Sequence, residues 1–498
     1  MENDLLDITK KSSIVFLGKL TGYFIGFIFS FIVARVIGPT LYGRYTYVFA
    51  FISFFSMFTK FGLHQGLLSF IPKLNTNSKI KKRNSIIKFS FVFSFLLSII
   101  FIIIIIFNLN FFSKTILNNK NINQLIVFMT PLIIVLTFNS IFEGVFRGLD
   151  KINIFIYSQR LLVPLSKLIL VIVFLIIGFK LYSIVVGVYL SFFIGLLYMY
   201  NKAKKYNIIG SLNYEYKSTY SDLCKFSFPL MMAGFLGFLI KRTDTFMIGF
   251  FLSEFDVGVY NIAYKLGLMS QFFLVAFIKV FAPIISTLYY EGKKEKLKKL
   301  YVSITKWIFA SNLIILFLVL IFSKEIMEIF GREYIYGSLA LIFIILGQTA
   351  NGVVGPADKI NVMTGYPQYS LYTNIIAIIF NIILNYNLIP IYGIEGAAFA
   401  SFISILISNL IRLFLLYKTH NIHPYNSEYL KVILSAFLPY VFINVINNLI
   451  YFHWLGNLII FSIGYLILFL IIYYHLGMSE EDELVWEKII NKKDELFK

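Results

Sequence analysis

The chain has 498 residues, of which 59% are hydrophobic and only 14% are charged, whereas about a quarter of the residues in soluble domains are charged. No water-soluble fold hides so much apolar side chain, so the composition predicts an all-α polytopic membrane protein. The formal net charge of +19 would suggest nucleic acid in a soluble protein. Here the excess Lys and Arg lie mostly in loops, where they set topology, and we expect no nucleic-acid partner.

Hydropathy, interrupted by polar and Pro/Gly clusters, predicts about fourteen transmembrane helices. The first is expected to be retained, because Glu2, Asp4 and Asp7 stand where a signal peptide carries basic residues. Cys224 is the only cysteine, so no intramolecular disulfide is expected. The predicted spans, in chain order, lie near 13–36, 45–71, 85–108, 122–147, 153–178, 181–202, 222–250, 257–287, 301–322, 335–361, 367–389, 394–417, 428–449 and 454–476.

The connections between these spans alternate in charge. Loops 72–88, 202–225 and 288–300 are rich in Lys and Arg, whereas 251–256 and 390–393 contain none. Because basic loops remain in the cytoplasm, the pattern predicts a multi-pass protein of the cell membrane. An even number of spans places both termini in the cytoplasm.

The two halves of the chain repeat a short pattern. Gly43-Arg44-Tyr45 follows the first span and Gly258-Val259-Tyr260 follows the seventh, while Gly148 and Gly365 lie at matching later positions. The offsets agree with a unit of six helices, which predicts parallel repeats with substrate bound between them. The expected domains are an N-lobe (1–205), a C-lobe (206–420), two appended helices (421–477) and a cytoplasmic C-terminal tail (478–498).

Charged side chains inside the spans are the candidate site residues, because each costs about 2.5–3.5 kcal/mol at the bilayer centre. Arg160 and Lys167 are seven residues apart and share a helix face, and His64 follows Lys60 by one turn. Acidic residues within the spans are few, so we predict a basic central cavity that binds substrate. Its candidate residues are Lys19, Lys60, Arg160, Lys167, Lys241, Arg242 and Lys265.

Each of these residues also has a structural interpretation. Arg160 lies near a span end, where its side chain can extend to the membrane surface. Lys241 and Arg242 are adjacent on one helix, so they need not face the same side. Asp244 is three residues from Lys241 and has two interpretations. It neutralises that lysine within the helix, or it titrates and couples transport to H⁺ or Na⁺.

Motifs at five places along the chain resemble those of the Wzx-type oligosaccharide flippases. These proteins form the polysaccharide-biosynthesis branch of the multidrug/oligosaccharidyl-lipid/polysaccharide exporter superfamily. The motifs are Ala34-Arg35-Val36-Ile37-Gly38-Pro39 with Tyr42-Gly43; Phe146-Arg147-Gly148 with Lys151; Phe228-Pro229-Leu230 with Arg242-Thr243-Asp244; Val257-Gly258-Val259-Tyr260 with Pro283-Ile284-Ile285-Ser286; and Thr364-Gly365 with Asn381, Leu388-Ile389-Pro390-Ile391-Tyr392-Gly393-Ile394 and Gly396-Ala397-Ala398.

The resemblance implies a MATE-like V of two pseudo-symmetric six-helix lobes, with two further helices at the C-terminus. It also implies a flippase that moves an oligosaccharide on a polyprenyl (pyro)phosphate from the cytoplasmic to the outer leaflet. The expected partners are therefore the lipid-linked oligosaccharide and membrane lipids. Glycosyltransferases or a polymerase of the same pathway are further candidates.

Two other classes of function compete with this interpretation. A cation-coupled drug or metabolite antiporter of the same superfamily would need an acidic and aromatic site, which the basic interior disfavours. A membrane glycosyltransferase or polysaccharide polymerase would need an acidic metal site or an acid–base pair. Glu254 and Asp256 are interpreted as a solvated turn, and His420 and His423 as loop residues. We therefore predict neither enzyme activity, nor a metal site, nor a cofactor.

Overall fold

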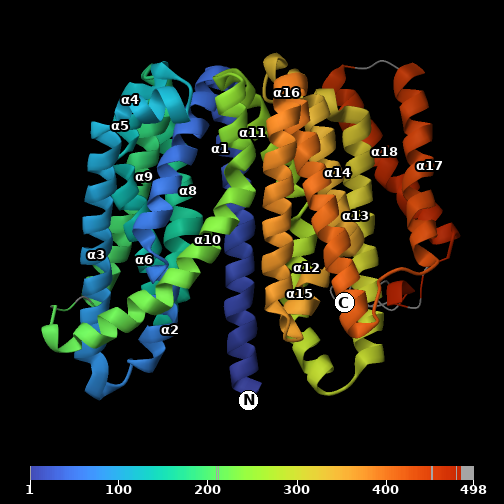
Figure 1. Ribbon diagram of the computed structural model, residues 1–498. Coiled ribbons are helices and arrows are strands. Elements are labelled where there is room, and N and C mark those ends of the chain that lie inside the picture. Colours follow the sequence, from blue (N-terminus) through green and yellow to red (C-terminus); the bar gives the residue numbers. More distant parts are fainter. Residues whose placement is uncertain are drawn as a thin grey trace, which may run out of the picture. The chain divides into compact units, whose positions relative to one another are not determined.

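The computed structural model describes the backbone of residues 2–208, 210, 212–449, 453–477, 479 and 481–483, and most side chains from Thr21 onward. The described residues are almost entirely helical and include no strand, as predicted (Figure 1). The helices are α1 (Glu2–Lys60), α2 (Leu63–Lys73), α3 (Ile80–Phe107), α4 (Leu109–Phe111), α5 (Asn123–Met129), α6 (Leu132–Gly148), α7 (Ile152–Ile156), α8 (Val163–Ile176), α9 (Leu181–Lys205), α10 (Lys217–Phe251), α11 (Glu254–Met269), α12 (Phe272–Tyr290), α13 (Lys294–Glu328), α14 (Ser338–Val354), α15 (Ala357–Met363), α16 (Pro367–His420), α17 (Glu428–Leu449) and α18 (Trp454–His475).

Eleven helical segments of the described chain are long and apolar enough to cross a membrane, or twelve if the bent pair α11–α12 counts as one span. Two of them, Phe24–Lys73 and Pro367–His420, are 50 and 54 residues long. About 20 residues cross the hydrocarbon core, so each of these two has the length of two spans. This length accounts for the difference from the roughly fourteen spans that hydropathy predicts.

Glycine with a positive φ marks the change of direction in both long segments. Gly38 in α1 has a φ of 77°, and Gly393 in α16 has a φ of 60°. Side chains other than glycine rarely adopt such angles. Pro39 then suits the first turn after the break, where its missing N–H costs nothing. The Gly-Pro pair thus ends one helix and begins the next.

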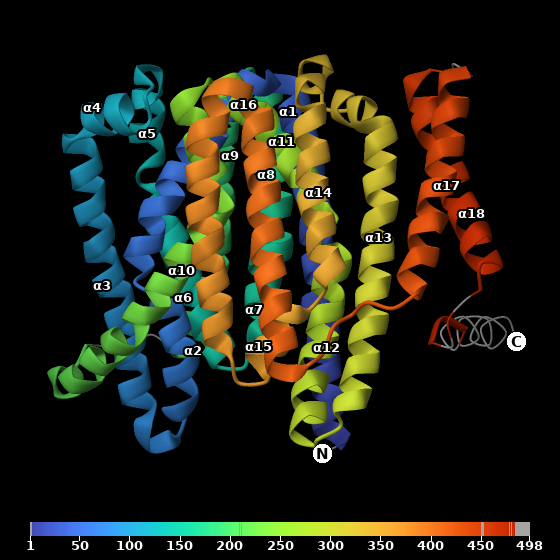
Figure 2. The ribbon, with the colours of Figure 1, turned by 45° about the vertical axis from the view of Figure 1, so that its right-hand side comes forward.

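The chain divides into two compact units, Met1–Gly258 and Val259–Lys498. In the first, α2, α3, α6 and α9 share an apolar core that includes Leu67, Ile87 and Phe146. In the second, α12, α13, α15 and α16 pack around Phe281, Tyr301 and other buried side chains. The helices α17 and α18 lie side by side and both pack on α13 (Figure 2).

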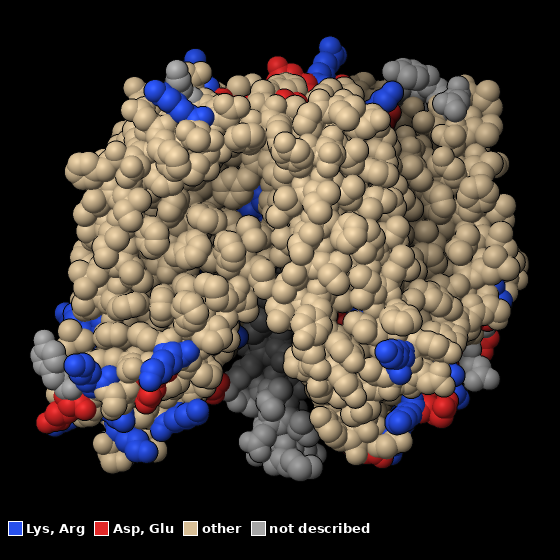
Figure 3. All heavy atoms as spheres, in the orientation of Figure 1, with Lys and Arg blue, Asp and Glu red and all other residues tan. Residues whose placement is uncertain are grey.

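Charged side chains gather at the two ends of each unit, and the band between them is almost entirely uncharged on the face that Figure 3 shows. In the first unit, the α2–α3 and α9–α10 connections lie at the end where α1 begins. These connections contain two of the basic loops. In the second unit, the α12–α13 and α15–α16 connections share one end, and the change of direction inside α16 lies at the other. The protein is therefore a multi-pass membrane protein.

The two copies of the repeated glycine motif contact each other within the first unit. A Cβ on Gly43 would lie 1.7 Å from the carbonyl oxygen of Glu254 and 2.6 Å from the nitrogen of Gly258. Reciprocally, a Cβ on Gly258 would lie 2.0 Å from the carbonyl oxygen of Pro39 and 3.1 Å from the nitrogen of Gly43. Two backbones can approach this closely only where both residues lack a side chain. The repetition of glycine therefore has a packing cause.

Candidate functional site

The second predicted span is broken in the first unit. α1 ends at Lys60, and α2 begins at Leu63 after Phe61 and Gly62, whose φ angles are 47° and 68°. A bulky residue such as phenylalanine rarely adopts a positive φ, and strain of this kind costs about 1–3 kcal/mol. Discontinuous transmembrane helices mark the binding sites of many carriers. The break is thus the first candidate site.

α10 lies directly against this break. A Cβ on Gly62 would lie 2.2 Å from the carbonyl oxygen of Ser227 and 2.8 Å from the nitrogen of Met231. One turn later, a Cβ on Gly66 would lie 2.2 Å from the hydroxyl oxygen of Ser227. Gly62, directly before α2, and Gly66, in its first turn, both lie against Ser227, and the absence of side chains allows this close helix contact. The position of the break is therefore fixed by packing.

Charged and polar side chains surround the break. Lys60 precedes it and His64 follows it, and α6 contributes Glu143 and Arg147, whose Oε1 and Nη1 atoms are 3.1 Å apart. Lys60 interacts electrostatically with Glu143, and His64 interacts with both Lys60 and Arg147. The His64 Nδ1 atom is buried and has no hydrogen-bond partner among the described residues. We call Lys60, His64, Glu143 and Arg147 the break cluster.

The break cluster corrects one detail of the sequence-based prediction. The sequence predicts Lys60 and His64 one turn apart on the same face of a continuous helix, but the break at Phe61 and Gly62 separates them. The cluster is held instead by α6. Its Gly144 lies so close to α2 that a Cβ would be 2.2 Å from the carbonyl oxygen of His64.

A second irregularity carries Arg160. Residues Tyr157–Leu162 form a π-helix between α7 and α8, and π-bulges occur frequently at functional sites. Two hydrogen bonds anchor it: the Ser158 hydroxyl donates to the carbonyl oxygen of Gly195 at 3.1 Å, and the Gln159 amide donates to Asn139 at 2.7 Å. The π-helix thereby gains fixed contacts to α9 and α6.

Arg160 and Lys167 both lie against α1. A Cβ on Gly22 would be 3.3 Å from the Arg160 carbonyl oxygen, and the Lys167 ammonium lies 4.0 Å from the centre of the Phe29 ring. Gly22 and Phe29 are seven residues apart, as are Arg160 and Lys167. The two basic residues therefore follow the same stretch of α1.

The remaining predicted site residues lie mainly on other helices. On α10, Lys241 is exposed, Arg242 is half-buried and interacts electrostatically with Tyr45, and Asp244 is 8% exposed. Lys265 is exposed on α11, in the second unit. The side chain of Lys19 lies outside the described residues. The structure thus groups Lys60 with α6, and places both Arg160 and Lys167 against α1.

The prediction that Glu254 lies in a solvated turn is wrong. The Glu254 carboxylate is buried, with an Oε2–Nε distance of 2.6 Å to Arg44, and its Oε1 atom accepts from Asn119 at 2.7 Å. Asp256 lies in the first turn of α11, where it accepts from the backbone and hydroxyl of Ser253 in a capping-box arrangement. Both carboxylates therefore stabilise the start of α11.

The second unit contains a chain of polar contacts that the sequence-based selection missed. The Gln348 carbonyl accepts from Gln271 at 2.6 Å and from Asn351 at 2.9 Å, and Asn409 donates to Asn351 at 2.8 Å. Arg412 continues the chain by donating to Asn409, Asn374 and Thr373, with Asp358 3.8 Å away. Arg412 and Asp358 lie in predicted spans, so a complete survey of intramembrane charges would have found them.

Among the described residues, no group of three or more His, Cys, Asp or Glu side chains is arranged to hold a metal ion. The charges mapped at the break and along the π-helix and α8 are instead mainly cationic. Lys60, Arg147, Arg160 and Lys167 are positively charged, and Glu143 is the carboxylate among them. Such groups favour an anionic ligand.

Comparison with known families places the chain in a defined group. The model of the family described as "Polysaccharide biosynthesis protein" matches residues 8–289, which is more than half of the chain. The MatE family model matches residues 229–387. Among curated proteins, the probable low-salt glycan biosynthesis flippase Agl15 of Haloferax volcanii is 27% identical over 182 residues. That match covers 35% of this chain and 37% of the relative, so it spans little more than a third of either protein.

Solved structures share the fold over a greater length. The lipid II flippase MurJ in an inward closed conformation has a TM-score of 0.73 at 15% identity, covering 96% of this chain and 99% of that protein. An inward-facing multidrug resistance transporter of the MATE family has a TM-score of 0.64 at 14% identity, covering 80% and 94%. At such identities the similarity establishes a MATE-like and MurJ-like helical fold.

Proposed function

We propose a function from one premise, which is that the chain belongs to the polysaccharide biosynthesis protein family. The protein is a flippase that moves a polyprenyl-(pyro)phosphate-linked oligosaccharide from the cytoplasmic to the outer leaflet by alternating access. Its product serves surface polysaccharide or glycan assembly. The names of its relatives support this proposal, since one is a probable glycan biosynthesis flippase and one, similar in fold, is a lipid II flippase.

The break cluster is the observation that carries the proposal. A phosphate or pyrophosphate group cannot enter hydrocarbon without charge compensation. Lys60 and Arg147 supply positive charge beside the N-terminus of α2, and the dipole of the helix favours negative charge at that end. An anionic headgroup therefore fits this place, while the polyprenyl tail stays in lipid.

The other predicted residues complete the proposed site. Arg160 and Lys167 along α1, Arg242 on α10, and Lys19, Lys241 and Lys265 add positive charge to the path of the headgroup. Binding of an anion would offset the repulsion between these groups. It would therefore favour a conformation in which the groups lie closer together. The basic loops 72–88 and 202–225 support a loading side, and both termini, in the cytoplasm.

Energy coupling is assigned to Asp244. This carboxylate is buried on α10, close in sequence to Lys241 and Arg242. Exchange of H⁺ or Na⁺ at Asp244 would change the net charge of the site during the cycle. Transport by Asp244→Asn should then lose its dependence on a proton or sodium gradient. Unchanged dependence would remove this residue from coupling.

A cation-coupled drug antiporter is the alternative with support, because the MatE model and MATE structures match this chain. The mapped charges of the first unit disfavour it, since they attract anions and repel organic cations. Efflux of cationic dyes from vesicles separates the two functions. A flippase should leave the dye gradient unchanged.

The direct test of the proposal replaces Lys60 in cells that lack the native gene. Lys60→Met removes one intramembrane charge at nearly constant side-chain volume, and we expect at least a tenfold loss of surface glycan with lipid-linked precursor retained in the cytoplasmic leaflet. Lys73→Met is the matched control, because Lys73 is exposed at the end of α2. Full glycan export by Lys60→Met at normal protein level would contradict the proposal.

A further inference from the structure

Lys306 is a buried lysine that the candidate site does not include. It lies on α13, twelve residues after the helix begins, inside the ninth predicted span, and is only 2% exposed. An ammonium group buried in this way is stable only when it is paired and hydrogen-bonded. The partner of Lys306 therefore affects the stability of the second unit.

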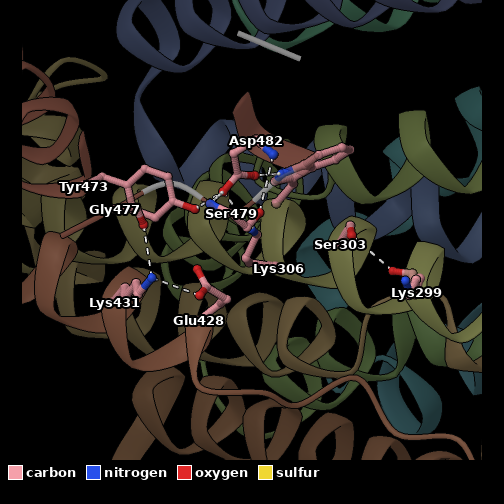
Figure 4. Close-up of polar contacts among 10 residues, drawn as sticks. Lys299, Ser303, Lys306, Glu428, Lys431, Tyr473, Gly477, Ser479 and Asp482 are labelled. Carbon is pink, nitrogen blue, oxygen red and sulfur yellow. Dashed lines mark hydrogen bonds and ion pairs between the residues drawn. The ribbon is translucent and has the colours of Figure 1, made fainter. Parts of the chain in front are cut away.

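That partner comes from the chain that follows α18. The Lys306 ammonium donates to Asp482 Oδ2 at 2.7 Å and to the Ser479 hydroxyl at 2.7 Å (Figure 4). The neighbouring indole of Trp307 donates to Asp482 Oδ1 at 2.7 Å. Two successive residues of α13 thus hold both oxygens of one carboxylate.

α18 holds the same carboxylate. The Tyr473 hydroxyl donates to Asp482 Oδ2, so the carboxylate lies between α13 and α18. Burial alone would raise the pKa of Asp482, but hydrogen bonds from Lys306, Trp307 and Tyr473 lower it to about 2. Asp482 is therefore ionised at every physiological pH, as a permanent counter-charge must be.

Local hydrogen bonds fix the backbone that carries the Asp482 carboxylate. Ser479 and Asp482 form a capping box, in which the Asp482 N–H donates to the Ser479 hydroxyl and the Ser479 N–H donates to the Asp482 carboxylate. Just before it, the Gly477 carbonyl accepts from Lys431 of α17, which also pairs with Glu428 at 2.9 Å. The segment is thus fixed to α13, α17 and α18.

An apolar contact joins the same helices elsewhere. Phe322 of α13 packs with Ile443 of α17 and with Phe461 and Tyr465 of α18. Phe322 is sixteen residues, or about 24 Å along a helix, from Lys306. The appended pair α17–α18 is therefore attached to α13 at two separate points, one apolar and one ionic.

We propose that the segment beginning at Ser479 is a latch that supplies the counter-charge of Lys306 and thereby holds α13 and α18 together as one body. Without the latch, the ammonium of Lys306 has no counter-ion among its described contacts and must take in water or leave its site. α13 then separates from α18 at that end. The latch is required for the attachment of α13 to α18 because Lys306 is charged. It should become dispensable once Lys306 is replaced by a neutral residue.

A rescue experiment tests the latch. Truncation after Met478 removes Asp482, and we expect it to lower the melting temperature of the purified protein by roughly 5 °C or more and to reduce glycan export at least tenfold. Adding Lys306→Met to the truncated chain should restore both properties to the level of Lys306→Met alone. Lys299→Met is the matched control, because Lys299 is exposed on the same helix and should rescue nothing.

A full-length variant covers the case in which the truncated chain fails to insert. Asp482→Asn keeps the size of the side chain but removes its charge, and should lower the melting temperature. Glu483→Gln makes the same chemical change at an exposed neighbour and should not. Equal melting of these two variants, or failure of Lys306→Met to rescue the truncation, would overturn the proposal. The melting temperatures are independent of the proposed transport function, so the two proposals can fail separately.

Discussion

At the scale of single residues, position within the fold decides what an embedded charge can do. Lys60 and Arg147 lie together at a helix break, Lys167 lies over an aromatic ring, and Lys306 is neutralised by Asp482. All are basic residues within or beside predicted spans, yet their surroundings differ completely. Lys306 has a carboxylate of its own, whereas Lys60 and Arg147 share the single carboxylate of Glu143, so their cluster keeps a net positive charge that favours an anion.

Lys241 and Lys265 provide a prediction at this scale. Both are exposed, so a glutamate at either position meets no steric obstacle. Lys241→Glu or Lys265→Glu should abolish glycan export, because each would place a negative charge on the proposed path of an anionic headgroup, while membrane insertion is preserved. Complementation of export together with membrane-fraction blots measures both quantities. Full export by both variants would remove these residues from the site.

At the scale of elements, irregular backbone carries the candidate site. The break between α1 and α2 and the π-helix at Tyr157–Leu162 each interrupt a span at a position that bears a predicted basic residue. Both interruptions have identified supports, in Ser227 for the first and Asn139 for the second. Irregular segments supported in this way persist because the surrounding packing determines them.

A substitution at Gly62 tests the close contact between α2 and α10. Gly62→Ala adds a Cβ 2.2 Å from the backbone oxygen of Ser227 and forces alanine into a positive φ, so we expect a loss of stability of about 2 kcal/mol or more. The loss appears as a lower melting temperature in detergent. Gly237→Ala on α10 is the control, since no atom lies within 4 Å of the new Cβ. If the two variants melt alike, the close α2–α10 contact is not as described.

Much of the architecture at this scale could be predicted from the sequence. Hydropathy located the spans, and the repeated glycines at 43 and 258 indicated a duplicated pattern whose close contact the structure then explains. The break at Phe61 could not be predicted, because Gly62 is the only local signal for it and its cause is the backbone of α10. The Lys306–Asp482 pair was missed for a similar reason, since a contact across 176 residues has no local pattern.

At the scale of the whole molecule, the distribution of charge sets orientation. The basic connections of each unit lie at one end of that unit, and the positive-inside rule predicts that this end faces the cytoplasm. Cys224 is the only cysteine, so a Cys224→Ser background permits single-cysteine labelling. A cysteine replacing Lys81 should react only with reagent from the cytoplasmic side, and one replacing Ser253 only from outside. Reversed labelling would invert the proposed orientation.

The most direct measurement of the central claim is flipping in proteoliposomes of three fluorescent lipids that share one polyprenyl tail and one disaccharide. They differ only in their linkage, which is a pyrophosphate, an uncharged ether or a quaternary ammonium. If basic side chains within the membrane bind an anionic headgroup, the protein flips the pyrophosphate lipid, Lys60→Met slows it at least tenfold, and the other two lipids stay in place. Flipping of all three at equal rates, or preference for the cationic lipid, would contradict the account.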